Sequence, residues 1–518
     1  MKHFNKIVHT LFRLCALIVI IIATIGNTFV EAKSSDTRPQ NISSLQESGS
    51  STPELIEQAF VNGEITAEQR LLYLTYALYD YESLPIQFHG TVGWSGTSYV
   101  RAIQNTLGVD STAKPLDFSA VQEEISLLSA QAGTVCDRED GPNSTETTHF
   151  YLSYDTIGGG LTIESYKNSL ETTFSTEVTN YGWPKPPFCI SGVGTCSTTN
   201  PWNKYPVQIV EMPDPTLTGY ITYGYVTALG GLYTGQVGDN ANTSETETSA
   251  TATCMVLNRD FTGYPGTPQN ALNATTAHEF VHAVQYGIVD SYYTEDHMWF
   301  ESSATYMEDE AFDEINDNYQ YLWPDFTSCQ GAYPSGRDDP LRFSNWLFFR
   351  YAAEHNGGTN VAGGGEDIMQ AFWTNVAAGQ TGLTAYNNAL GIKGTTTTLA
   401  DTFHNYAIAA RFSKACPLAE PYCFEEAADY ITKKGTVGNL FQMSIDNPVY
   451  SNGAIQNNYA INYIGLPITG SYSITLDVTS ASGELRGTIV ADLGDRLDIT
   501  PLPNIVSPER VFLKLISG

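Results

Sequence analysis

The stretch from Thr275 to Glu310, TTAHEFVHAVQYGIVDSYYTEDHMWFESSATYMEDE, contains the pattern HExxH at residues 278–282. Residues four apart lie on one face of an α-helix, so a helix here would place the imidazoles of His278 and His282 side by side. Two neutral imidazoles suit Zn²⁺, and a neighbouring carboxylate can take a proton from zinc-bound water. The stretch therefore predicts a zinc site with His278 and His282 as ligands and Glu279 as the general base.

A catalytic zinc ion needs a third protein ligand and an open position for water. Glu301 can supply this ligand, because the eighteen residues between it and His282 are enough to end one helix, cross a loop and begin another near Trp299. Glu308 follows Glu301 by seven residues, which is two helical turns on the same face. We expect Glu308 to accept a hydrogen bond from the free ring nitrogen of a ligating histidine and so to fix its tautomer.

The first helix also has other interpretations. Thr276 and Glu279 fit a capping box, in which Glu279 would only satisfy backbone N–H groups at a helix N-terminus. Paired histidines can likewise be hydrogen-bonded core residues. Gly287 is expected just after the C-terminal end of this helix, where glycine tolerates the left-handed conformation. The metal site is the favoured interpretation, because Glu301 has the spacing that a third ligand requires.

HExxH followed after eighteen residues by Glu resembles the gluzincin metallopeptidases. WFESSATYMED is similar to the WxxEGxxxYxE region of the aminopeptidase N and leukotriene hydrolase group, but it has one residue fewer between Trp and Glu. It also has Ser302 in place of Gly, and a GxMEN-like exopeptidase motif is missing upstream. The chain more closely resembles a family of secreted bacterial metallopeptidase-like proteins with AHEFxHAxQ followed by W(F/M)xExxAxxMED, here residues 277–285 and 299–309.

This resemblance implies an α+β fold with a gluzincin-like, that is thermolysin-like, metallopeptidase domain. It implies a secreted zinc-dependent peptidase that acts on a protein or peptide substrate, with Zn²⁺ held by the residues named above. It also implies that the strand expected at 252–261 borders the cleft and pairs with extended substrate. A gluzincin needs a Tyr or His that stabilises the oxyanion. Tyr333, Tyr351 and His355 lie downstream, and the sequence does not choose among them.

The N-terminus has the pattern of a secretory signal over residues 1–32. Basic residues precede an apolar run from Leu14 to Ile25, and Val30-Glu-Ala32 is a small-residue cleavage sequence. An uncleaved membrane anchor is the alternative, but the apolar run is short for a membrane span. We therefore expect a secreted protein without a membrane span after removal of the signal.

The chain is acidic, with a formal net charge of −31 over 518 residues. This charge argues against nucleic acid and anionic membranes as partners. The acidic run after Glu308 offers oxygen ligands for a structural Ca²⁺, namely Asp313, Glu314, Asp317 and Asn318. A charge run is also typical of a solvated helix face, and this alternative stays open.

Composition and periodicity divide the rest of the chain. Residues 33–51 are rich in Ser, Thr and Gln and predict a disordered linker. Residues 52–140 are helical in pattern and are either a removable pro-region or a permanent part of the protein. Residues 141–434 would form the zinc metallopeptidase domain, and 435–518 alternate in the manner of a β-rich, β-sandwich-like module.

Two pairs of cysteines could close short disulfide loops. The pairs Cys189/Cys196 and Cys416/Cys423 are each close in sequence, and an oxidising compartment permits such bonds. Besides the peptidase, we consider a non-enzymatic surface or binding protein that keeps a metal-binding, peptidase-like fold. The intact Glu279 argues against this alternative, because a purely structural metal site does not need a base at that position.

Overall fold

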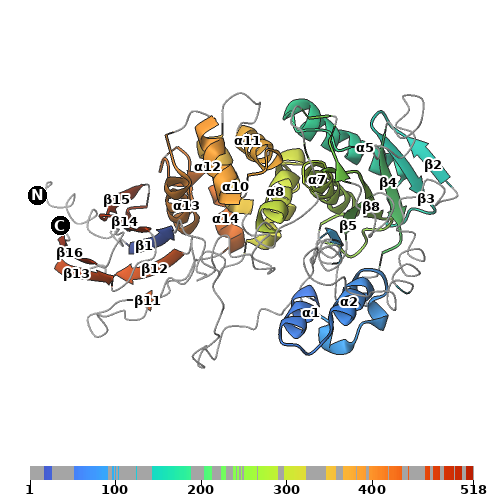
Figure 1. Cartoon of the computed structure of the whole chain (residues 1–518). Coiled ribbons are helices and arrows are strands. Elements are labelled where there is room, and N and C mark those ends of the chain that lie inside the picture. Colours follow the sequence, from blue (N-terminus) through green and yellow to red (C-terminus); the bar gives the residue numbers. More distant parts are fainter. Residues whose placement is uncertain are drawn as a thin grey trace, which may run out of the picture.

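The protein combines helices with two larger sheets (Figure 1). The computed structural model of the chain describes residues 17–25, 52–90, 96–97, 100, 103, 124, 143–187, 204–212, 223–228, 237–240, 242–243, 247, 250–264, 266–289, 297–322, 346–357, 366–380, 382–392, 396–417, 419–434, 441–442, 461–466, 471–478, 484–494, 496–504 and 509–516. The predicted linker at 33–51, the pair Cys189/Cys196 and Tyr333 lie outside these residues. Of the helices in the described part, none is both long and apolar enough to cross a membrane.

A five-stranded mixed sheet forms the scaffold of the site. Its order is β2 (Asn143–Glu146), β3 (Phe150–Tyr154), β4 (Tyr205–Val210), β8 (Thr253–Asn258) and β5 (Gly224–Ala228). The three central strands are parallel, and β2 and β5 are antiparallel to their neighbours. Helix α5 (Ile163–Phe174) connects β3 to β4, as parallel strands require a crossover.

The two faces of this sheet are buried against different helices. Alternate side chains of a strand point to opposite faces. Met255 and Leu257 belong to the same core as α5 and α7 (Pro268–Tyr286), whereas Cys254 and Val256 belong to the core of the N-terminal helices. These are α1 (Thr52–Val61) and α2 (Ala67–Tyr79), which lie on the other side of β5 and β8 from α7 (Figure 1).

Strand β8 corrects one sequence-based expectation. The segment 252–261 was expected to pair with extended substrate at the cleft, but β8 is paired with β4 on one side and β5 on the other. Its backbone groups are therefore already used in the sheet. At this side of the described sheet, β5 is the edge strand.

Helix α7 carries the HExxH residues and begins earlier than a capping box at Thr276 would require. Thr267 caps its N-terminus by accepting from the Asn270 N–H, and Pro268 occupies the first turn. Thr276 and Glu279 lie in the middle of the helix, so the capping-box interpretation is wrong. Every residue from 274 to 286 is buried, which makes α7 a central core helix.

Gly287 ends α7, but for a different reason from the one expected. Its φ of −70° and ψ of −7° are ordinary right-handed values, so the predicted left-handed conformation is wrong. A Cβ at this position would lie 2.7 Å from Cδ of Pro187. The helix end therefore needs glycine, because the segment that contains Pro187 approaches it closely.

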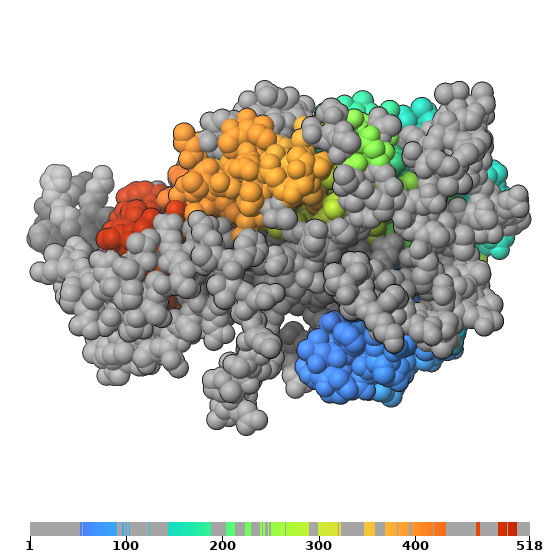
Figure 2. Space-filling model, in the orientation of Figure 1, coloured from blue at the N-terminus to red at the C-terminus, as the bar shows by residue number. Residues whose placement is uncertain are grey.

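The remaining helices form the second half of the core. They are α8 (His297–Ala311), η5 (Asp317–Tyr321), α10 (Trp346–Asn356), α11 (Glu366–Ala377), α12 (Gly382–Ile392), α13 (Leu399–Phe412) and α14 (Ala427–Lys434). Trp299 of α8 packs against Phe349 of α10, Phe372 of α11 and Tyr386 of α12. Figure 2 shows residues of α11 to α13 in orange along the upper side, and those of α1 and α2 in blue at the lower margin.

The C-terminal region forms two sheets. One has the order β11 (Phe441–Gln442), β12 (Ile461–Leu466), β1 (Leu17–Ile25), β14 (Glu484–Asp492) and β15 (Leu497–Pro501), and the other pairs β13 (Ser471–Val478) with β16 (Glu509–Ile516). Residues 17–25 of the apolar run predicted as the signal core form the strand β1, antiparallel to both β12 and β14. Removal of residues 1–32 stays a prediction, and it would separate β12 from β14.

The predicted disulfide between Cys416 and Cys423 is present, with a Cα–Cα distance of 5.2 Å. It closes the short segment in which β9 (Lys414–Ala415) pairs with β10 (Cys423–Phe424). Cys254 of β8 is also disulfide-bonded, and its partner lies outside the described residues.

Candidate metal centre

The three predicted ligands converge between α7 and α8. The Nε2 atoms of His278 and His282 lie 3.0 Å apart. Oε2 of Glu301 lies 3.3 Å from Nε2 of His278 and 3.5 Å from Nε2 of His282. A tetrahedral zinc ion with bonds of about 2.0–2.1 Å separates its ligand atoms by about 3.3 Å. The donor atoms and their spacing therefore fit Zn²⁺ without rearrangement.

The outer ring nitrogens of both histidines have their own acceptors. Nδ1 of His278 lies 2.7 Å from Oε1 of Glu308, as predicted. Nδ1 of His282 lies 2.8 Å from Oε1 of Gln285, one turn further along α7. If each Nδ1 carries the proton and donates it, each Nε2 keeps a lone pair for a metal ion.

Gln285 is a further contact of the candidate site, and motif spacing alone did not predict its role there. Its Nε2 donates to the Phe300 carbonyl at 3.2 Å and to Ser303 Oγ at 3.1 Å, both on α8. These contacts orient the amide so that its oxygen faces His282. Gln285 is the last residue of AHEFVHAVQ and follows His282 by three positions, so the sequence places it near that histidine. Its acceptors on α8 could not be predicted from spacing.

The site is buried, and its ionisable groups shift the pKa values of one another. His282 and Glu301 are fully buried, and Glu279 and His278 nearly so. Burial disfavours the charged form of His278, but hydrogen bonds to Glu301 and Glu308 outweigh it and raise its pKa. Burial in turn raises the pKa of the Glu308 carboxyl. A divalent cation would replace the proton on His278 as the positive partner of these carboxylates.

A second buried acid lies near the same histidine. Glu177 belongs to η3 (Ser175–Asn180), a π-helical turn that continues α5. Its side chain is fully buried, and neither carboxyl oxygen has a hydrogen-bond partner among the described residues. Burial raises the pKa of Glu177 well above its ordinary value, and the positive charge of His278 opposes this. Burial therefore favours the neutral form of the Glu177 carboxyl.

Glu279 points to a residue from the N-terminal region. Its Oε2 accepts a hydrogen bond from the Thr97 hydroxyl at 2.5 Å. Thr97 Oγ1 in turn accepts from the backbone N–H of Val226, on β5, at 2.7 Å. The candidate base is thus linked to the edge strand of the described sheet through a residue 182 positions away in sequence.

Of the three residues considered as oxyanion stabilisers, the two that the structure describes make contacts elsewhere. The Tyr351 hydroxyl donates to the Pro421 carbonyl at 2.7 Å, and Nε2 of His355 lies 2.9 Å from the Cys423 carbonyl oxygen. Both therefore hold the loop that the Cys416–Cys423 disulfide closes. Burial and the negative charges of Glu308, Asp317 and Glu301 raise the pKa of Tyr321, whose hydroxyl therefore keeps its proton beside these carboxylates.

The acidic run expected to bind calcium does not form a comparable cluster. Among the described residues, ligand atoms of three His, Cys, Asp or Glu side chains converge at the zinc candidate and at His355 with Cys416 and Cys423. The second group consists of a disulfide and a histidine, so it is not available as a thiolate site. Asp313 and Glu314 are exposed, and a Ca²⁺ site there stays a prediction.

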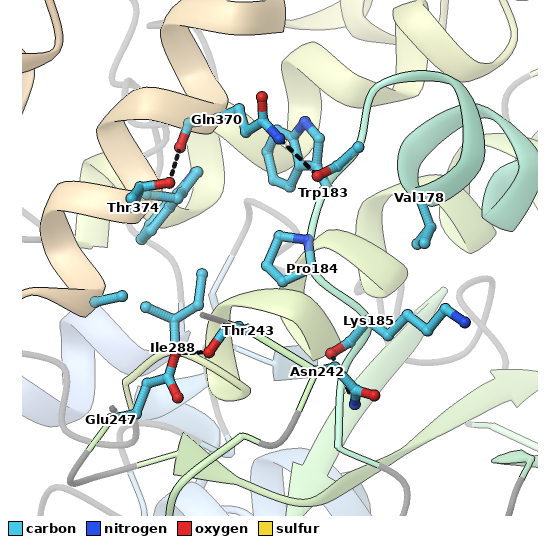
Figure 3. A pocket seen from close by; sticks show the side chains of 13 residues that line it. Val178, Trp183, Pro184, Lys185, Asn242, Thr243, Glu247, Ile288, Gln370 and Thr374 are labelled. Atoms are coloured by element: carbon cyan, nitrogen blue, oxygen red, sulfur yellow. Dashed lines mark hydrogen bonds between the residues drawn. The ribbon is translucent and has the colours of Figure 1, made fainter. Parts of the chain in front are cut away.

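A pocket of about 450 Å³ lies beside the C-terminal end of α7 (Figure 3). It is lined by Trp183 and Pro184 on one side, Trp373 and Thr374 of α11 on another, and Ile288 just after α7. Gln370 of α11 donates to the Gly182 carbonyl at 2.6 Å and joins the two walls (Figure 3). None of the metal-ligand candidates lines this pocket, so it is separate from the site described above.

No protein-family model matches the chain, and no curated protein or solved structure matches it. The interpretation of the site therefore depends on the residues and their geometry.

Proposed function

We propose that the chain is a secreted zinc-dependent peptidase of gluzincin type. The observation that carries this proposal is the convergence of His278 Nε2, His282 Nε2 and Glu301 Oε2 within 3.0–3.5 Å of one another, with Glu279 adjacent on α7. Two imidazoles and one carboxylate are a ligand set typical of catalytic zinc, which keeps a fourth position for water.

A bound zinc ion would act as a Lewis acid on the scissile carbonyl and lower the pKa of its water to about 7. The residues of the chain would carry out the remaining tasks. The carboxylate of Glu279 would accept a proton from the attacking water and deliver it to the leaving amide nitrogen. Glu308 and Gln285 would hold the two imidazoles in the tautomer that directs Nε2 toward the metal ion.

The burial of the site also supports the proposal, because it would keep bulk water away from the reacting groups. In such surroundings, fixed charges and dipoles act on the reacting groups more strongly than they would in water. The described residues of the site do not identify a preferred substrate side chain, so an unfolded protein is the appropriate first substrate.

Metal removal and replacement test the proposal. We expect the purified protein to cleave unfolded casein, to lose this activity after dialysis against a chelator, and to regain it with one equivalent of Zn²⁺. Zinc-loaded protein of native fold that leaves casein intact would contradict the proposal and favour the non-enzymatic binding protein.

A further inference from the structure

Thr97 connects the candidate base to the sheet. Thr97 is fully buried, and its hydroxyl has one proton and two lone pairs. The Val226 N–H occupies one lone pair, at 2.7 Å, and the proton is donated to Oε2 of Glu279, at 2.5 Å. The hydroxyl is therefore oriented by β5 before it reaches the carboxylate, and it restricts where Oε2 of Glu279 can lie.

The segment that carries Thr97 is anchored in an apolar core. Residues 97, 100 and 103 are helical, and their spacing of three places them on one helix face. Val100 and Ile103 are fully buried. They belong to the same apolar cluster as Cys254 and Val256 of β8, and that cluster also includes side chains of α1 and α2. Thr97 is thus held in place by the core that covers the second face of the sheet.

This core argues against a removable pro-region. Without residues 52–103, the side chains of Tyr225, Cys254 and Val256, which are 3%, 0% and 0% exposed, would lose their cover. A sheet with one face uncovered would expose a contiguous apolar surface to water, which folded proteins avoid. The N-terminal helices therefore behave as a structural layer of the domain.

We propose that Thr97 is a positioning residue for Glu279, and that residues 52–103 are a permanent part of the catalytic unit. This inference rests on the proposed peptidase function. It goes beyond that function by assigning a role to a segment that contains no ligand or base. Thr97 does not touch the reacting atoms in this account; it acts by holding the Glu279 carboxylate in one orientation.

The test compares Thr97→Val, which removes the hydroxyl, with Thr97→Ser, which keeps it. With casein as substrate, we expect Thr97→Val to lower kcat about 10- to 100-fold, as loss of supporting contacts does at metal sites, with KM changed less than about threefold. We expect Thr97→Ser to restore kcat to within about threefold of the wild type. Zinc content should stay at one equivalent in both variants.

Thr75→Val provides the matched control. Thr75 is also a fully buried threonine of the N-terminal region, but its hydroxyl donates to the Leu71 carbonyl of its own helix. We expect this variant to keep the wild-type kcat. Unchanged or increased kcat in folded, zinc-loaded Thr97→Val would overturn the positioning role while the wild type still cleaves casein. Failure of the wild type to cleave would instead remove the proposed function.

A second measurement does not depend on how a variant folds. Intact-mass analysis of the active wild-type protein should show that residues 52–103 are still present. An active species that begins after residue 140 would overturn the inference and establish the pro-region interpretation.

Discussion

Oε1 of Glu308 lies 2.7 Å from Nδ1 of His278 and joins α8 to α7 across 30 residues of chain. Together with the contact between Gln285 and His282, it gives each candidate ligand histidine one dedicated acceptor. The histidines are therefore held in place before any metal ion binds.

Replacement of the two acceptors should weaken zinc binding. We expect Glu308→Ala and Gln285→Ala each to lower zinc affinity about 10- to 100-fold, because loss of such supporting contacts lets the imidazole rotate or change tautomer. Competition with a chromophoric chelator measures this affinity. Glu314→Ala, at an exposed position a few residues after Glu308, is the control and should bind zinc normally. Unchanged affinity in both test variants would show that the acceptors do not orient the histidines.

Replacement of a ligand should abolish stoichiometric zinc binding. We expect His282→Ala to be purified with much less than one equivalent of zinc, because only His278 and Glu301 would remain to hold the ion. His355→Ala is the matched control, since His355 lies at the disulfide loop. Elemental analysis after gel filtration provides the measurement. A fully loaded His282→Ala protein would remove His282 from the ligand set.

The end of α7 should be sensitive to a single methyl group. In Gly287→Ala the new Cβ would lie 2.7 Å from Pro187 Cδ, and we expect a loss of about 1–3 kcal/mol in unfolding free energy. Gly391 of α12 is the control, because a Cβ there meets nothing within 4 Å. Gly391→Ala should stabilise the protein by about 0.5–1 kcal/mol. Equal effects of the two changes in chemical denaturation would refute the close approach.

Asp309, a buried acid on α8, should make stability depend on pH. Burial, only partly offset by Arg350, raises the pKa of Asp309 to about 8. Between pH 4 and pH 8 the Asp309 carboxyl is therefore ionised in the unfolded chain but protonated in the folded protein. Its contribution to the free energy of unfolding falls as the pH rises. Asp309→Asn removes the effect.

We expect the stability of Asp309→Asn relative to the wild type to rise between pH 4 and pH 8. The change should be at least about 1.4 kcal/mol, the equivalent of one pKa unit. Denaturant midpoints at the two pH values measure it. A difference that is constant with pH would mean that Asp309 is already ionised in the folded protein.

The sequence predicted the parts of the site that depend on helical spacing. His278 and His282 are four residues apart, and Glu301 and Glu308 are seven apart, so each pair shares a face wherever the helix forms. The structure brings these groups together as expected. The start of α7 was not predicted, because Thr276 and Glu279 resemble a local cap whereas Thr267 and Pro268 form the real one.

What the sequence could not predict depends on tertiary topology. β5 and not β8 lies at the edge of the described sheet, because the order of strands is set by packing. The contact between Thr97 and Glu279 spans 182 residues, and no periodicity links the two. The role of Gln285 likewise required the position of α8, since its amide is oriented by Phe300 and Ser303.

The most direct test of the account is Glu279→Gln, prepared beside the wild type and loaded with one equivalent of Zn²⁺. The glutamine side chain is nearly the same size but cannot accept the proton of the attacking water. We predict that the variant keeps its zinc and cleaves casein at least about 100-fold more slowly, the lower range for loss of a general base. Chelator-sensitive cleavage at the wild-type rate by zinc-loaded Glu279→Gln would contradict the proposed mechanism.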